Sequence, residues 1–260
     1  MTVPYPFGIG KGCYLRRSFE VKCNTSSYPA SFPTIFDTKV YEIAQLHVIV
    51  HGDLVIPFVY NKSSGESEYM AAPYSVSSDD LTDDFSVSHT ENQFVAIGCD
   101  IYAYITDIRT SDIVSGCPSL CKNSSISPMG SSSYCSGKRC CRDTIPKDLI
   151  DMAFYVQTMN TWDRSWESDP CSFAMVVHKD FSDFNKFNLS DCAVDSHRAP
   201  LALDWGIGNI SCHEAIKNGT CICGQNSECI NSSRGVGYSC RCLTGYQGNP
   251  YLHDGCQGIT

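Results

Sequence analysis

The sequence of 260 residues is poor in positive charge and has no long apolar run. Its 19 lysine and arginine residues stand against 28 acidic residues, which gives a net charge of −9. That balance argues against a protein whose whole surface binds nucleic acid. No apolar run reaches the roughly 18 residues that a membrane-spanning helix needs, so the sequence predicts no such helix.

Enzyme motifs are missing as well. The sequence contains no Gly-x-Ser-x-Gly, no His-Glu-x-x-His and no phosphate-binding loop. The acidic pairs at residues 79–80 and 83–84 lie in the polar stretch 61–92, which predicts a solvated loop, and they lack the Asp-x-Asp-x-Asp-Gly spacing of a calcium loop. We therefore expect a protein that is not an enzyme and that has no cofactor and no bound metal.

Cysteine, in contrast, is abundant. The chain has 17 cysteines, spread from Cys13 to Cys256. A reducing cytosol would leave them as thiols, so they favour an oxidising compartment. Seven Asn-x-Ser/Thr sequons favour a secreted surface that carries sugar. These predicted glycosylation sites are Asn24, Asn61, Asn123, Asn188, Asn209, Asn218 and Asn231.

The start of the chain does not fit this extracellular interpretation. Residues 1–4 lack the basic start and the apolar core of a secretory signal peptide. We therefore expect the N-terminus to be truncated or foreign. The odd number of cysteines agrees, since one thiol must have lost its partner or must pair outside this chain.

Seven of the cysteines lie between Cys212 and Cys256. The pair Cys240-x-Cys242, then Gly245-Tyr246 and a closing cysteine resemble an epidermal-growth-factor-like (EGF-like) module. A zinc site is the alternative, but structural zinc sites typically use separated ligand pairs such as Cys-x-x-Cys, which this segment lacks. The resemblance leaves out one of the crowded early cysteines and implies three bridges: Cys212–Cys229, Cys223–Cys240 and Cys242–Cys256. No acidic residue directly precedes the first of these cysteines, so we expect no Ca²⁺ in the module.

The rest of the chain has the patterns of β-strands. Apolar runs at 40–50 and 54–60, separated by a glycine-containing break, predict a hairpin. Residues 101–106 and 150–157 alternate with period two, and residues 173–177 form a short apolar run. We expect a mainly β fold with two disulfide-rich domains, at 1–106 and 107–206, followed by the small EGF-like module at 207–257.

Two further bridge predictions follow from cysteine positions. Cys13 and Cys23 could close a hairpin-sized loop, worth roughly 3 kcal/mol in the chain-entropy model. Adjacent Cys140 and Cys141 point to opposite faces of an extended chain, so we expect them to enter two different bridges.

Several segments together resemble the extracellular region of plant wall-associated receptor kinases. Pro4-Tyr5-Pro6-Phe7-Gly8-Ile9-Gly10, with the spaced Cys13 and Cys23, is similar to their galacturonan-binding domain. Residues 137–142 resemble their second, C-terminal-type cysteine-rich region, and residues 201–206 resemble the link to their EGF-like module. The family usually has a Cys-Gly pair just upstream of the first motif and often a cysteine near position 59, where this chain has valine.

The resemblance implies a plasma-membrane receptor ectodomain that recognises pectin or oligogalacturonides in the plant cell wall. Its transmembrane helix and kinase domain would lie outside this chain. Pectin is a polyanion and this chain is acidic, so binding requires a local basic patch within the short range of screened charges. Arginine and lysine suit carboxylates, arginine in a bidentate manner. The candidate residues are Lys11, Arg16, Arg17 and Lys22 in a first cluster, and Lys138, Arg139 and Arg142 in a second.

Other interpretations remain open. The same cations could be ordinary solvated side chains, and Tyr5, Phe7 and Tyr14 could either stack on sugar rings or belong to the core. The chain could bind an extracellular protein or peptide, with the EGF-like unit as a spacer. It could also belong to a secreted protein without a kinase that acts as a decoy.

Overall fold

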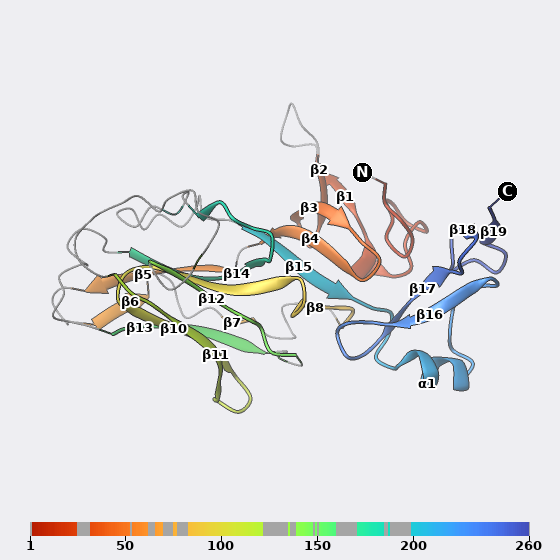
Figure 1. The fold of residues 1–260 in the computed structure, drawn as a ribbon. Helices are drawn as coiled ribbons and strands as arrows, with labels where there is room; N and C mark the ends of the chain where they lie inside the picture. Colours follow the sequence, from red (N-terminus) through yellow and green to blue (C-terminus); the bar gives the residue numbers. More distant parts are fainter. Residues whose placement is uncertain are drawn as a thin grey trace. The chain divides into compact units, whose positions relative to one another are not determined.

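The computed structural model describes residues 2–24, 32–52, 54–61, 66–69, 75–76, 83–121, 135, 139–147, 149, 151–159, 171–184, 187 and 199–259 (Figure 1). Within these residues, strands dominate, and the helical elements are the single turn η1 (Arg17–Phe19) and the short helix α1 (Cys212–Lys217). The prediction of a mainly β fold is therefore confirmed. In the described part of the chain, no helix has the length and apolar character to cross a membrane.

Two compact units make up the chain. Unit 1 consists of Met1–His51, Ser78–Ser88 and Ala202–Thr260, and unit 2 consists of Gly52–Ser77 and His89–Leu201. The predicted boundary at residue 106 is wrong for the strands. Strand β10 (Ile101–Asp107) crosses residue 106 and pairs with strands that follow it in the chain. Strand β14 (Cys171–His178), which lies in the second predicted domain, pairs with β5 (Val55–Asn61) and β9 (Asn92–Ile97) of the first. Composition changes mark loops along the chain, whereas these pairings join distant segments that carry no local signal.

Unit 1 is built on a six-stranded sheet with the order β1-β2-β3-β4-β15-β8. Strands β2 and β3 form a tight hairpin whose two turn residues, Phe36 and Asp37, have φ of 52° and 59°. Two positive φ values in a two-residue loop match the twist of antiparallel strands. The strands are β1 (Lys22–Asn24), β2 (Phe32–Ile35), β3 (Thr38–Ile43), β4 (His47–Gly52), β8 (Phe85–Val87) and β15 (Ala199–Trp205).

The predicted hairpin between residues 40–50 and 54–60 is wrong. The first run contains its own turn, so that β3 pairs with β4 within it, Val40 opposite Val50. The second run becomes β5, which pairs with β6 and β14 of unit 2. Both runs are apolar and rich in β-branched residues, and this pattern identifies strands without identifying their partners.

Four aromatic rings form the core of unit 1. Phe7, Phe19, Phe85 and Trp205 are each at most 4% exposed. The ring of Phe7 meets Phe19 and Trp205 edge to face, with centroids 5.1 and 5.3 Å apart, which is a favoured geometry for aromatic pairs. The Trp205 indole N–H donates to the carbonyl of Ala44 at 3.1 Å. Phe7 is therefore a core residue rather than a sugar-stacking one.

Unit 2 contains two sheets, with the orders β12-β9-β14-β5-β6 and β11-β10-β13-β7. The rings of Phe94 on β9 and Phe154 on β13 stack 6.1 Å apart, and both side chains are fully buried, so the sheets share a core. The strands are β5 (Val55–Asn61), β6 (Glu66–Tyr69), β7 (Ser75–Val76), β9 (Asn92–Ile97), β10 (Ile101–Asp107), β11 (Ile113–Ser119), β12 (Cys140–Asp143), β13 (Met152–Thr158) and β14 (Cys171–His178).

Sequence periodicity located several of these strands well. Strand β10 alternates between buried and half-buried residues, as its period-two pattern predicts. The runs at 150–157 and 173–177 correspond to β13 and β14. The polar stretch at 61–92, in contrast, contributes the strands β6, β7 and β8 and is not a continuous loop.

Three disulfides join described residues of unit 2. They are Cys99–Cys121, Cys117–Cys141 and Cys135–Cys140. The adjacent cysteines Cys140 and Cys141 enter two different bridges, as predicted from their opposite directions in an extended segment. Cys171 is disulfide-bonded as well.

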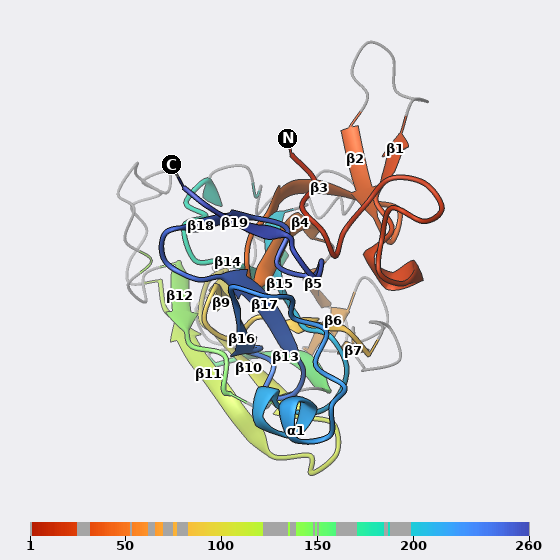
Figure 2. The same ribbon diagram turned by 90° about the vertical axis from the view of Figure 1, so that its right-hand side faces the viewer.

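The C-terminal part of unit 1, residues 207–257, is called the cysteine module below. Its bridges are Cys212–Cys229, Cys223–Cys240 and Cys242–Cys256, the pairing that the resemblance implies. Figure 2 shows α1 with the two short ribbons of this module. They are β16 (Ser227–Asn231) with β17 (Tyr238–Cys242), and β18 (Tyr246–Gly248) with β19 (Cys256–Gly258).

The predicted bridge between Cys13 and Cys23 is not formed, since both are exposed free thiols. Backbone hydrogen bonds close the N-terminal loop instead: Gly8 N–H donates to the Phe19 carbonyl, and Val21 N–H donates to the Gly8 carbonyl. These bonds align Gly8 with residues 19–21 and leave Cys13 in the turn beyond it.

Candidate ligand-binding surface

The N-terminal motif positions the first basic cluster. Phe7 and Phe19 are buried in the core, so the segment between them is a surface loop anchored at both ends. Gly8 is required in this arrangement, because a Cβ atom there would lie 1.9 Å from the carbonyl oxygen of Cys13. The turn η1 directly precedes β1, and together they present Arg17 and Lys22 on the surface of unit 1.

An open pocket lies at this place. Its lining residues come from η1, β1 and the β2–β3 turn; they are Arg17, Ser18, Glu20, Lys22 and Phe36. Phe36 is 42% exposed, and its ring packs edge to face against the ring of Phe85, with centroids 5.2 Å apart. Two cations, a hydroxyl and an exposed aromatic ring are groups that can bind a carboxylated sugar.

Acidic groups partly offset the charge of the pocket. Lys22 Nζ lies 3.4 Å from Asp37 Oδ1, in a pair whose two side chains are both mostly exposed. Exposed pairs of this kind contribute little energy and separate readily in favour of another anion. Glu20 also lines the pocket, and its carboxylate disfavours an anion that binds close to it.

Arg16 forms an ion pair with a buried carboxylate and does not line the pocket, unlike its neighbour Arg17. Its Nη1 lies 3.0 Å from Oδ1 of Asp84, whose side chain is only 4% exposed. Ser18 Oγ donates to the other carboxylate oxygen at 2.5 Å. A buried carboxylate must be paired or hydrogen-bonded, so the role of Arg16 is to neutralise Asp84. The expectation that Asp84 lies in a solvated loop is wrong.

Arg234 of the cysteine module binds the same segment. Its guanidinium donates to the carbonyls of Asp83 and Gly206. Burial lowers the pKa of Arg234, although the nearby carboxylates of Asp84, Asp83 and Asp204 act in the opposite direction. This buried charge network joins segments that are far apart in sequence. Sequence reasoning missed it because isolated charged residues give no signal of burial.

The first cluster is therefore divided. Arg17 and Lys22 line the pocket, Arg16 holds the buried Asp84, and Lys11 is exposed in the loop without lining the pocket. Tyr5 contacts Tyr251 of the cysteine module with ring centroids 5.3 Å apart. Tyr14 is half-buried and does not line the pocket.

The second cluster belongs to unit 2 and does not form an open basic site among the residues that the structure describes. Lys138 lies outside the described residues. Arg139 adopts a φ of 58° in the turn before β12, and its backbone bonds to Leu120 and Gly98 fix that turn. The guanidinium of Arg142 lies over the ring of Phe184 at 5.1 Å, and burial lowers its pKa. Arg142 thus contributes mainly to packing.

The predicted glycosylation sites are only partly described. Asn209, Asn218 and Asn231 are exposed, as a sugar acceptor must be. Asn24 and Asn61 are the last residues of strands β1 and β5, and the structure does not describe their side chains. Asn123 and Asn188 lie outside the described residues.

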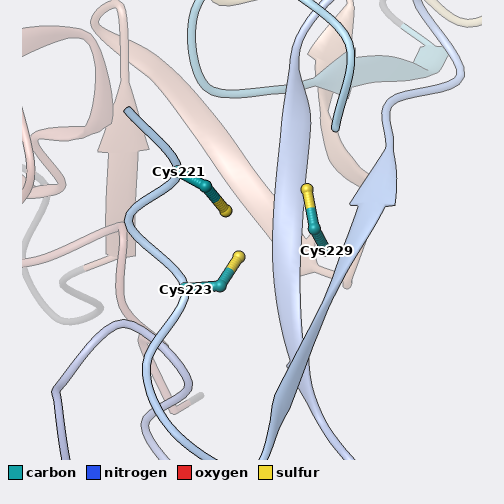
Figure 3. A group of neighbouring side chains, drawn as sticks. All are labelled: Cys221, Cys223 and Cys229. Atoms are coloured by element: carbon teal, nitrogen blue, oxygen red, sulfur yellow. The ribbon is translucent and has the colours of Figure 1, made fainter. Parts of the chain in front are cut away.

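One group of possible metal ligands occurs in the described chain. The Sγ atoms of Cys221, Cys223 and Cys229 all lie within 4.8 Å of one another (Figure 3). Two of these cysteines are disulfide-bonded, so the group offers a single thiolate. Structural zinc needs four ligands, and this group therefore does not fit a zinc site.

A mainly β chain held by many disulfides, with exposed sequons, is typical of the extracellular proteins. No family model and no solved structure matches the chain. Among curated proteins of Arabidopsis thaliana, wall-associated receptor kinase 5 is 31% identical over 263 residues, and wall-associated receptor kinase 1 is 30% identical over 268 residues. Each match covers 100% of this chain and 33% of the relative.

Along its whole length the chain is homologous to wall-associated receptor kinases. It spans about a third of the length of the curated relatives that it matches. Its disulfides and exposed sequons fit the extracellular region of such a receptor.

Proposed function

We propose that this chain is the ligand-binding extracellular region of a wall-associated receptor and that it recognises pectin or oligogalacturonides at the pocket of Arg17 and Lys22. The observation that carries the proposal is the convergence of these two cations with the exposed ring of Phe36 in one open pocket. The name of the family supports a ligand in the plant cell wall.

The charges set conditions on such a ligand. A chain of net charge −9 repels a polyanion at long range, and salt limits that repulsion to about 8–10 Å. Arg17 can bind a uronate carboxylate through two parallel N–H bonds, and Lys22 can supply a second cation. The apolar face of a sugar ring can pack on Phe36. Glu20 opposes a second carboxylate close by, so Glu20→Gln is expected to strengthen binding.

The test is a titration of defined, de-esterified oligogalacturonides by calorimetry at two salt concentrations. We expect Arg17→Ala and Lys22→Ala each to weaken binding by about ten- to a hundredfold, since a charge-assisted bond contributes roughly 1.5–3 kcal/mol. The matched control is Arg241→Ala, which removes the same charge from an exposed pair with Glu228 in the same unit. This control should leave the affinity unchanged.

Two outcomes would contradict the proposal. Equal losses in Arg17→Ala and Arg241→Ala would show that overall charge matters and that the pocket does not. Absence of binding at low salt would favour a protein or peptide partner over pectin.

The cysteine module fits an EGF-like unit that acts as a spacer between the pocket and the rest of a receptor. Its three bridges have the first-to-third, second-to-fourth and fifth-to-sixth order when Cys221 is left out. We include in the proposal that the exposed sequons carry sugar and that a kinase follows in the full receptor. Sequencing a longer transcript distinguishes a receptor from a secreted decoy.

A further inference from the structure

The sulfur group of the cysteine module contains a free thiol next to two disulfides. Cys221 is free, Cys223 is bonded to Cys240, and Cys229 is bonded to Cys212. Figure 3 shows Cys221 and Cys223 projecting from one segment towards the strand that carries Cys229. All three Sγ atoms lie within 4.8 Å of one another, so the free sulfur of Cys221 lies close to one sulfur of each of two disulfides.

The backbone around Cys221 is held in this place. Tyr238, which is 3% exposed, donates its hydroxyl hydrogen to the Thr220 carbonyl and accepts a bond from Ile222 N–H, both at 3.2 Å. The Cys221 N–H itself donates to the Ala215 carbonyl at 3.1 Å. Hydrogen bonds on both sides therefore hold the backbone of Cys221 beside the two disulfides. The thiol can meet them without unfolding of the module.

We propose that Cys221 is an exchanging thiol that isomerises the disulfides of this module. The Cys221 thiolate attacks Sγ of Cys229, the Cys221–Cys229 bond forms, and the Cys212–Cys229 bond breaks. The electron pair leaves on Sγ of Cys212, which takes up a proton and becomes the free thiol. One disulfide and one thiol are present before and after the step, so no oxidant or reductant is consumed.

Attack at Cys229 is favoured over attack at Cys223. A bond from Cys221 to Cys223 would join residues two apart in an extended segment, whose Cα atoms are separated by about 6.6 Å, at the edge of the range for disulfides. It would also release Cys240, which is 1% exposed, whereas Cys212 is 9% exposed. The leaving thiol is thus the one nearer to solvent.

The exchange changes the attachment of α1. Cys212 is the first residue of that helix, and its bridge to Cys229 ties the helix to β16. After exchange, the Cys221–Cys229 bond links β16 to the segment that follows the helix instead of to the helix itself. The native bridge closes a loop with a sequence separation of 17, against 8 for the new one (229 − 221), so in the chain-entropy model the new bridge constrains the unfolded chain less and stabilises the folded module less against unfolding.

The test uses the full chain in mildly alkaline buffer without added thiol, because thiol–disulfide exchange proceeds through the thiolate. Samples are taken over time, quenched with acid, labelled with N-ethylmaleimide and mapped without reduction. At the start we expect the label on Cys221 and on the exposed Cys13 and Cys23. With time, label should appear on Cys212, together with a Cys221–Cys229 linked peptide.

Two variants provide the controls. Cys221→Ser should abolish labelling of Cys212, whereas the double variant Cys13→Ser/Cys23→Ser should retain it. If Cys221→Ser does not fold, alkylating Cys221 of the double variant before incubation should give the same loss. The proposal is overturned if Cys212 stays unlabelled in the unmodified chain, if its labelling survives in Cys221→Ser, or if Cys240 becomes labelled in its place.

Discussion

The two units use cysteine and positive charge in different ways. In unit 2, every described cysteine is bridged, and Arg142 packs against a phenylalanine. In unit 1, three described cysteines are free thiols, and Arg17 and Lys22 line an open pocket. The described free thiols and the cations that line the pocket thus lie in the unit that has a small aromatic core and a cysteine module.

The difference has a physical basis in core size. Unit 2 buries long runs of apolar side chains between two sheets, with Phe94 to Ile97 and Phe173 to Val177 nearly inaccessible to solvent. The cysteine module has little apolar core and depends on its bridges, as small extracellular units generally do. We expect reduction or mutation of cysteines to affect unit 1 more than unit 2.

The largest expected effect is on the aromatic core. Phe19→Ala removes a fully buried ring that contacts Phe7, Phe85 and Trp205, and it should lower the free energy of unfolding of unit 1 by about 3–5 kcal/mol. Phe94→Ala should do the same in unit 2. Hydrogen exchange read by mass spectrometry should show faster exchange in β3 and β4 for the first variant, and in β9 and β14 for the second. Identical exchange patterns in the two variants would contradict the separation into two cores.

The loss of stability on removal of a disulfide should increase with the length of the loop that the disulfide closes. Cys223→Ser/Cys240→Ser opens a loop with a separation of 17 residues and should cost about 3 kcal/mol, whereas Cys135→Ser/Cys140→Ser opens one of 5 and should cost about 2 kcal/mol. Denaturant unfolding of the two double variants measures this order. A larger loss in unit 2 would show that its bridges matter more than the comparison implies.

The neighbouring arginines of unit 1 should have separable roles. Arg16→Ala leaves the buried Asp84 without its cation and should lower the free energy of unfolding by about 1–2 kcal/mol. Arg17→Ala should change stability by less than about 0.5 kcal/mol while it weakens ligand binding. Thermal unfolding and the oligogalacturonide titration, carried out on both variants, check this. Equal stability losses would mean that Arg17 is structural too.

The smallest expected effect is a pH dependence of α1. Hydrogen bonds from the backbone and side chain of Ser211 lower the pKa of Glu214, which forms a capping box with Ser211. A lowered pKa in the folded state means that the stabilisation is present above the ordinary glutamate pKa of about 4.3 and is lost as the pH falls below it. The protection factors of the amides of residues 212–217, which correct for the slower intrinsic exchange in acid, should therefore fall in that acidic range in the native chain. In Glu214→Gln this fall should be absent.

The amino-acid sequence by itself determined the fold class, and its cysteine content favoured an oxidising environment. Period-two patterns located β10 and β13, because alternation of side chains is a local property of a strand. The resemblance to a known module supplied the pairing from Cys212 to Cys256, and the adjacency of Cys140 and Cys141 fixed that they enter separate bridges.

Only the tertiary structure decided which strands pair, which cysteines stay free and which cations remain available. Strand partners such as β14 with β5, and the ion pair of Arg16 with Asp84, join residues distant in the sequence. Burial of Asp84 and of Arg234 depends on what folds over them, and neither residue carries that information locally. Arg16 and Arg17 are neighbours of the same type, yet one holds a buried carboxylate and the other lines the pocket, because the chain turns between them.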